Sequence, residues 1–361
     1  MKILKQAVVI LLVASYSAIF GEFYVRIMRS TPMMPRYVTA APYGVRMNVP
    51  GAVYWQTTPE VRVQIRINTA GIRTDREFPY QKPPGVCRVV VFGDSFFMGY
   101  EVELQNSFTE WLERTLREHG KPCEVVNLAV SGFGTAEMLV ALQAEGLRYQ
   151  PDIVIFQWHV SDPGDNLRSG LFTTRGGELV RASGEYLPAV SIRDFLSKFA
   201  VYRWLIENSR LYSRVRGLLA VKTKRLLVQL RRRQDVDDIP EEAGVAEVER
   251  TKPGSAPAGD TLDVLLLLEA RGISKKNGAE FLLVDIPFRD SRVEFHPSLG
   301  RLPLDSLRGI EIVSPTSAFL AAADPNQMLY YEQGHGHLSI RGNEILQDEV
   351  AKKILTAGWL D

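Results

Sequence analysis

Ser95 stands where a serine can act as a nucleophile. It follows an apolar run, Val89 to Phe92, and the pair Gly93 and Asp94. A serine between a buried strand and a helix is exposed at the sheet edge, and backbone N–H groups of the helix N-terminus can stabilise an oxyanion. Asp and Ser are also ordinary helix caps. The segment alone therefore leaves a catalytic and a capping interpretation open.

The elements around Ser95 predict the edge of a parallel sheet. Short apolar runs occupy 89–92, 124–130, 152–158, 280–286 and 310–313, and segments of helical spacing occupy 106–119, 136–147, 261–277 and 343–357. Alternation of this kind predicts a parallel sheet covered by helices, with ligands beyond the carboxyl ends of the strands. Ser95 lies at such an end.

The N-terminus predicts a membrane helix. Lys2 and Lys5 precede a strongly apolar run that continues to Val25. An uncleaved anchor over 1–28 is the preferred interpretation, and a cleaved signal with a weak site at 15–17 is the alternative. Positive charges ahead of the apolar run tend to stay inside, so we expect the body of the protein outside the cytoplasm, periplasmic or on the cell surface.

The rest of the chain divides into an extension and a main domain. Residues 29–85 form the extension, in which 60–68 alternates apolar and polar residues as an edge strand does. The main domain covers 86–361 and carries an insertion at about 168–260. We expect that insertion to hold a hairpin and then one or two basic helices, whose charges are more often a solvated face than a membrane contact.

Cys87 and Cys123 each precede an apolar run. If these runs are parallel neighbours, the strand starts lie side by side and a disulfide can form in an oxidising compartment. Two unrelated buried thiols are the alternative.

Four separated blocks in order resemble the GDSL/SGNH hydrolase family, and the resemblance spans roughly 86–361. The blocks are "VFGDSFFMG", "VVNLAVSGFGT", "DIVIFQWHVSDPGDN" and "GHGHLSIRGNEIL". The resemblance implies that Ser95 is the nucleophile and that its N–H serves the oxyanion hole. It implies that Gly132 supplies the second oxyanion donor. His337, five residues before Gly342, matches the catalytic histidine.

The third block departs from the family pattern. Ser161 and Asp162 stand where the family has Asn-Asp. A serine hydroxyl is a shorter and freely rotating donor, so Asn166 is an alternative third oxyanion donor to Ser161.

The fourth block lacks the usual acid, because His335 and Gly334 occupy its positions. Three interpretations remain: a Ser-His dyad oriented by a backbone carbonyl, Glu332 as the acid, or a site without activity. Glu332 with His335 is a second candidate pair for the base.

Several classes of partner and cofactor receive no support. The 361 residues carry 43 Lys and Arg against 42 Asp and Glu, which gives no electrostatic case for nucleic acid. Residues 132–137 lack the third glycine of a dinucleotide fingerprint. His119, His159 and His296 have no ligand-spaced cluster, so neither a metal nor another cofactor is expected.

These observations predict an α/β three-layer sandwich with a flavodoxin-like parallel sheet, an N-terminal membrane helix and a hairpin-helix insertion. The favoured function is ester hydrolysis on an acylated glycan or lipid. An O-acetyltransferase or accessory protein of exopolysaccharide modification is the first alternative, and a non-catalytic glycan-binding protein is the second.

Overall fold

Five parallel strands form the central sheet, in the order β6-β5-β7-β10-β13. The computed structural model describes residues 2–28, 31–33, 35, 37–219, 222, 223, 226 and 258–360. The strands are β5 (Cys87–Phe92), β6 (Cys123–Asn127), β7 (Ile153–Trp158), β10 (Glu280–Asp285) and β13 (Glu311–Val313). Of these five strands, β5 comes first in the chain and lies inside the sheet, and β6 comes second and forms the edge beside it, which is the flavodoxin-like order. The predicted fold class is confirmed.

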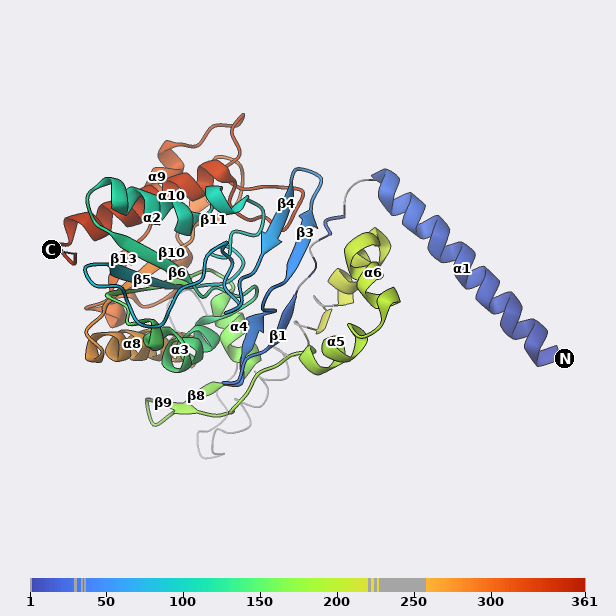
Figure 1. Ribbon diagram of the computed structural model, residues 1–361, viewed down its shortest axis with the longest axis horizontal. Helices are drawn as coiled ribbons and strands as arrows, with labels where there is room; N and C mark the ends of the chain where they lie inside the picture. Colours follow the sequence, from blue (N-terminus) through green and yellow to red (C-terminus); the bar gives the residue numbers. More distant parts are fainter. Residues whose placement is uncertain are drawn as a thin grey trace, which may run out of the picture.

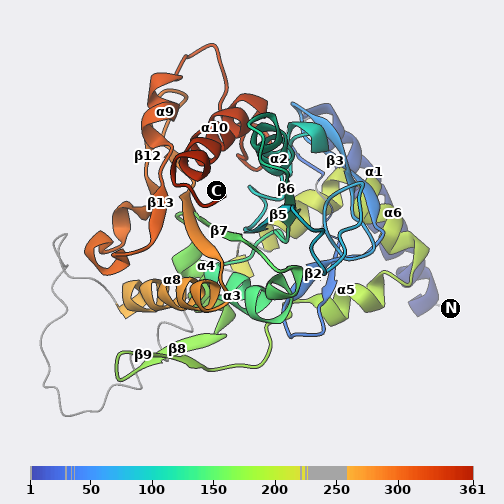
Figure 2. The ribbon, with the colours of Figure 1, turned by 60° about the vertical axis from the view of Figure 1, so that its left-hand side comes forward.

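Helices cover both faces of this sheet (Figures 1 and 2). One face carries α2 (Phe108–Glu118), α9 (Thr316–Ala321) and α10 (Ile340–Thr356), and the other carries α3 (Thr135–Ala144) and α8 (Ala258–Lys276). Successive strand side chains point to opposite faces. In β5, Val89 and Val91 therefore pack into the core under α2 and α10, whereas Val90 and Phe92 pack into the core under α3 and α8.

The N-terminal extension forms two small hairpins beside the sheet. These pair β1 (Val38–Ala40) with β2 (Arg46–Asn48) and β3 (Val53–Thr57) with β4 (Arg62–Arg66). Alternation in β4 was predicted correctly, since Val63 and Ile65 are buried while Arg62 and Arg66 are exposed. However, β4 pairs with β3 and is not an edge of the five-stranded sheet.

The expected hairpin and helices lie in the insertion. After α4 (Asp162–Ser169), its elements are β8 (Phe172–Arg175), β9 (Glu178–Arg181), α5 (Val190–Leu196), α6 (Ala200–Asn208) and a further helical stretch over 210–219. Gly176 and Gly177 form the turn between β8 and β9 with positive φ. The part of the insertion from 220 to 257, which includes the end of the expected basic helices, lies mostly outside the described residues.

Shorter elements complete the chain. They are the 3-10 helices η1 (Leu104–Asn106), η2 (Gly146–Tyr149), η3 (Ser298–Arg301) and η4 (Leu304–Leu307) and the hairpin of β11 (Phe288–Arg289) with β12 (Phe295–His296).

The first helix, α1 (Lys2–Met28), projects away from the rest of the molecule (Figure 1). Its segment Leu4–Met28 is long and apolar enough to cross a membrane, and only 6% of its most apolar window is buried.

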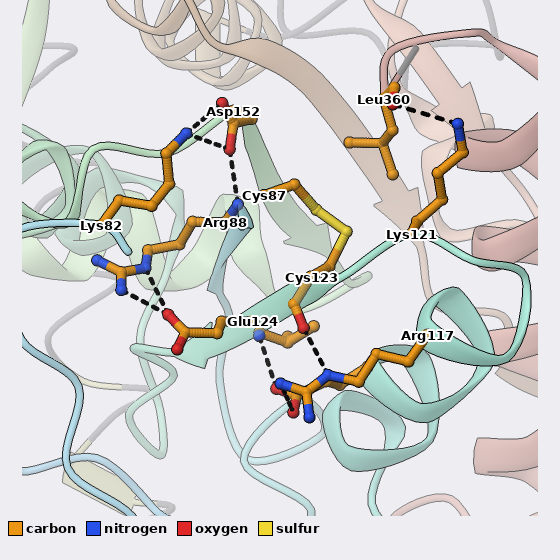
Figure 3. The surroundings of a disulfide bond; sticks show 11 residues. Lys82, Cys87, Arg88, Arg117, Lys121, Cys123, Glu124, Asp152 and Leu360 are labelled. Atoms are coloured by element: carbon orange, nitrogen blue, oxygen red, sulfur yellow. Dashed lines mark hydrogen bonds and ion pairs between the residues drawn. A yellow bond between two sulfur atoms is a disulfide. The ribbon is translucent and has the colours of Figure 1, made fainter. Parts of the chain in front are cut away.

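A disulfide joins Cys87 and Cys123 at the start of β5 and β6 (Figure 3). The two residues are register partners, and their Cα atoms lie 4.4 Å apart. Polar contacts surround the bond at the same end of the sheet. The buried Arg88 side chain bonds Glu124, and the Arg88 backbone N–H donates to Asp152 at 2.6 Å. This end of the sheet lies opposite the end that carries Ser95.

Reduction of the disulfide should lower the free energy of unfolding. The bond closes a loop with a sequence separation of 36, for which the chain-entropy model gives roughly 3–4 kcal/mol. Thermal melting of the oxidised protein, with and without reductant, measures the difference. A Cys87→Ser/Cys123→Ser variant that does not respond to reductant is the control. Two free thiols in protein isolated from an oxidising compartment would contradict the bond.

Candidate active site

The turn after β5 is fixed by Asp94 and Gln157. The Gln157 side chain accepts from the N–H groups of Asp94 and Phe97, each at 3.2 Å, and donates to Asp94 Oδ1 at 2.7 Å. A Cβ at Gly93 would approach Gln157 Oε1 to 2.6 Å, so only glycine allows this contact. Asp94, a secondary candidate for chemistry, is therefore bound into the turn that presents Ser95.

Ser95 does not lie at the N-terminus of a regular helix, contrary to expectation. Residues 95–101 form successive turns, in which Tyr100 N–H bonds Ser95 O at 3.2 Å, and α2 begins only at Phe108. The reason is local: the positive φ of Gly99 directs the chain into a loop. No dipole of a regular helix therefore points at Ser95 along this segment.

His337 contacts Ser95 directly. Its Nε2 lies 2.7 Å from Ser95 Oγ, and the histidine is 6% exposed. The loop that carries His337 ends at Ser339, whose side chain caps α10 by accepting from Gly342 N–H. A Cβ at Gly342 would collide with Leu329 O, which explains why glycine follows the histidine at this spacing.

Glu101 orients His337, and sequence reasoning missed it. Its Oε2 lies 2.8 Å from His337 Nδ1 and also accepts the backbone N–H of His337 at 3.2 Å and of His335 at 3.4 Å. The glutamate is 1% exposed. With Nδ1–H donating to Glu101, Nε2 holds the lone pair that can accept the Ser95 hydroxyl proton.

The surroundings of Glu101 keep its carboxyl ionised. Burial by itself raises the pKa, but the hydrogen bonds from His337 and the backbone N–H groups bring the pKa of Glu101 below its ordinary value. A carboxylate with a lowered pKa adds stability above its unfolded-state pKa and loses it as pH falls through the folded-state pKa. A Cβ at Gly334 would collide with Glu101 Oε1, so glycine is required where the histidine loop passes the acid.

Glu332, the acid expected from the sequence, lies elsewhere. Its carboxylate pairs with Arg292 at 2.7 and 2.8 Å, and this hydrogen-bonded pairing lowers the pKa of Glu332. The structure places Glu101 rather than Glu332 at the imidazole. A buried carboxylate, and not a backbone carbonyl, lies at Nδ1 of His337. His335 is exposed, with its ring centroid 6.1 Å from that of His337.

Gly132 and Ser161 lie beyond the ends of β6 and β7. Gly132 has a φ of +78°, and its carbonyl accepts from Arg46 at 2.8 Å. Ser161 is half-buried, and its Oγ lies 3.0 Å from His159 Nδ1. The Phe96 ring contacts both His159 and His337, with centroid distances of 4.7 and 5.1 Å. Phe96 thereby connects the third and fourth sequence blocks beside Ser95.

Asn166, the alternative oxyanion donor, is 1% exposed and makes packing contacts through its side chain. Its Nδ2 donates to Asp263 Oδ1 at 2.7 Å, and its Oδ1 accepts from Ala136 N–H at 2.8 Å. Both ends of the amide are therefore used to join α3, α4 and α8.

Asp162 is 1% exposed and accepts from His159 N–H at 2.6 Å. Burial, with the nearby charge of Asp94, raises the pKa of Asp162 well above its ordinary value.

The N-terminal extension holds the loop that carries Glu101. Arg73 is 3% exposed and donates to the carbonyls of Met98, Gly99 and Val102, at 2.7 Å for Met98 and 2.6 Å for Val102. Burial lowers the pKa of Arg73 to about 10, which leaves it charged at neutral pH. One buried guanidinium thus fixes both sides of the Glu101 turn.

The extension also contacts the other loops of the site. Arg46 bridges the Gly132 carbonyl to the buried Glu137 carboxylate at 2.9 Å. Glu60 accepts the N–H groups of Glu332 and Gln333, which precede the histidine loop. The residues preceding the main domain are therefore part of the support of this site.

A cluster around His296 corrects one expectation. Asp290, Glu294 and His296 bring ligand atoms within 4.8 Å of one another near the β11–β12 hairpin, although the sequence suggested no cluster there. The two acids are exposed, and exposed acidic groups of this kind are common without a metal.

Similarity to known proteins covers a short part of the chain in sequence and about three quarters of it in structure. No family model matches. An arylesterase of Vibrio mimicus is 31% identical over 75 residues, which are 21% of this chain and 38% of the arylesterase. The solved structure of TesA gives a TM-score of 0.40 at 14% identity, covering 74% of this chain and 97% of its own. A putative lipolytic protein of the G-D-S-L family from Desulfitobacterium hafniense gives a TM-score of 0.39 at 12% identity. That match covers 73% of this chain and 98% of the other chain.

The chain resembles the GDSL/SGNH hydrolases. The arylesterase match covers little more than a third of that protein, and the TM-scores are low.

Arg73→Lys should slow the reaction of Ser95 with a fluorophosphonate probe. An ammonium group cannot reach three carbonyls as the guanidinium fork does, so the Glu101 turn loosens. We expect labelling to slow by about tenfold and the free energy of unfolding to fall by about 2 kcal/mol. The matched control is Arg66→Lys, whose side chain is 57% exposed. Unchanged labelling in folded Arg73→Lys protein would contradict the positioning role.

Proposed function

We propose that this protein is a serine-dependent ester hydrolase of the GDSL/SGNH type. The observation that carries the proposal is the continuous chain of hydrogen bonds from Ser95 through His337 to Glu101, with distances of 2.7 and 2.8 Å. A serine, an imidazole and a buried carboxylate in this order are the parts that nucleophilic acyl chemistry needs.

The reaction follows from these contacts. His337 Nε2 takes the proton of Ser95 Oγ as the oxygen attacks the ester carbonyl, and Glu101 stabilises the imidazolium that forms. The backbone N–H groups of Ser95 and Gly132, with the Ser161 hydroxyl, are proposed to hold the oxyanion. His337 then protonates the leaving alcohol. Water, activated by the same histidine, attacks the acyl-enzyme and releases the acid.

We further propose that the substrate is an acylated glycan or lipid outside the cytoplasm. Three features support this location: the apolar helix α1, the lysines that precede it, and the paired Cys87 and Cys123. Cysteine pairs of this kind persist in oxidising compartments.

An acyltransferase would use the same acyl-enzyme. In that case a sugar hydroxyl, and not water, attacks the Ser95 ester, and the acyl group moves to the sugar. Hydrolysis remains the first proposal because it needs no second substrate. The non-catalytic alternative arose from the missing acid, and Glu101 now fills that place at His337.

Ser95→Ala should abolish turnover of p-nitrophenyl acetate and labelling by a fluorophosphonate. The variant lacks the nucleophile, and loss of a triad serine lowers kcat by about 10⁶-fold in a well-studied protease. The exposed Ser191→Ala is the control and should behave as the unmodified protein. Equal turnover in Ser95→Ala would overturn the proposal. Adding sugar acceptors to the unmodified enzyme and measuring acylated sugar separates transfer from hydrolysis.

Glu101→Gln and Glu332→Gln form a matched pair that identifies the acid. We expect Glu101→Gln to lower kcat by about 10²- to 10⁴-fold, because the amide neither holds the imidazole tautomer nor stabilises the imidazolium. Glu332→Gln should stay within about twofold, since it disrupts partly exposed ion pairs with Arg292 and Arg289 that lie away from the imidazole. Steady-state kinetics on p-nitrophenyl acetate measures both. A reversed order of effects would return the acid role to Glu332.

A further inference from the structure

Three consecutive helical segments of the insertion expose large apolar side chains. These segments are α5, α6 and the helical residues 210–219. The side chains, each 47–71% exposed, are Ile192, Phe195, Phe199, Val201, Trp204, Val215, Leu218 and Leu219. Spacings of three place Ile192 with Phe195, Val201 with Trp204 and Val215 with Leu218 on shared helix faces. Soluble proteins rarely leave so many large apolar groups together in water.

The same segments are basic. Residues 190–219 hold six Lys or Arg and two acids. A helix that presents Trp, Phe and Leu together with Lys and Arg has the composition of one that lies in a membrane interface. The aromatic side chains suit the headgroup level, and the cations attract anionic lipid.

The end of α1 is joined to these segments by polar contacts that are partly buried or exposed. The Glu22 carboxylate accepts Ser209 Oγ at 2.7 Å and the N–H groups of Arg210 and Leu211 at 3.1 and 3.0 Å. Arg26 donates to Asn208 O, at the end of α6, at 2.6 Å. In Figure 1, α5 and α6 lie between the N-terminal hairpins and α1.

These contacts set the height of the insertion relative to a bilayer. The segment from Leu4 to Gly21 rises about 27 Å at 1.5 Å per residue, close to the ~30 Å of a hydrocarbon core. If α1 spans the bilayer, Glu22 and Arg26 lie at its surface. The helices bonded to them lie at the same level.

We propose that α5, α6 and residues 210–219 form an interfacial platform that lies on the bilayer surface beside α1. The occupant of this apolar face is the headgroup and upper acyl region of a membrane that contains anionic lipid. The proposal rests on the membrane anchor proposed above and not on catalysis. The enzyme would thus be held by two contacts, which fixes its orientation and not only its distance from the membrane.

Lipid quenching of single fluorescent labels tests the platform in the full-length chain. Trp204→Cys, labelled with a nitrobenzoxadiazole dye, is reconstituted in vesicles of phosphatidylcholine with about a third phosphatidylglycerol. Leu304→Cys is the matched control, because Leu304 is 56% exposed, as Trp204 is at 57%, but lies in η4 of the main domain. Leu12→Cys reports on α1 itself.

We expect a shallow doxyl lipid to quench the label at 204 about twofold or more relative to the label at 304, and a deep doxyl lipid to quench the label at 12. Equal quenching at 204 and 304 while position 12 is quenched would overturn the platform. A blue-shifted but unquenched label at 204 would also overturn it, because a protein surface would then cover the face. An unquenched label at 12 would overturn both anchor and platform. Ester turnover is measured separately, so loss of activity is distinguished from all of these.

Discussion

A single buried carboxylate oxygen, Oε2 of Glu101, accepts three N–H groups from the loop that carries His337. It fixes the imidazole through Nδ1 and the backbone of the same histidine through N–H. The loop after β5 and the loop before α10 are 236 residues apart in sequence and meet at this oxygen. Because a carboxylate deprived of these donors would be costly to bury, the two loops are held in one arrangement. The contact between Ser95 and His337 depends on that arrangement.

The support behind this interaction comes largely from outside the sheet. The buried Arg73 holds the Glu101 turn by its carbonyls, and Arg46 holds the Gly132 peptide. Both belong to the N-terminal extension. The extension is therefore part of the structural support of the site, and it does more than connect α1 to the main domain.

The parts of the structure that local patterns encode could be predicted from the sequence. Apolar runs predicted all five strands of the sheet, and the spacing from His337 to Gly342 indicated the loop before α10. Glu101 was missed because the family pattern places the acid near the histidine, whereas here it follows the serine by six residues. A signal was present, since an acid stands between Tyr100 and Val102 in an apolar segment. Only the fold shows that this carboxylate lies next to Nδ1 of His337.

The disulfide between β5 and β6 links the opposite end of the nucleophile strand to its neighbour. A chain that crosses a membrane unfolded must stay free of this bond until it reaches an oxidising compartment. Before the bond forms, β5 and β6 are held together by their backbone hydrogen bonds, by the Arg88–Glu124 ion pair and by the packing of their buried side chains. For an exported chain, as proposed above, oxidation after translocation would join β5 to β6 covalently, so that this part of the fold is completed only on arrival.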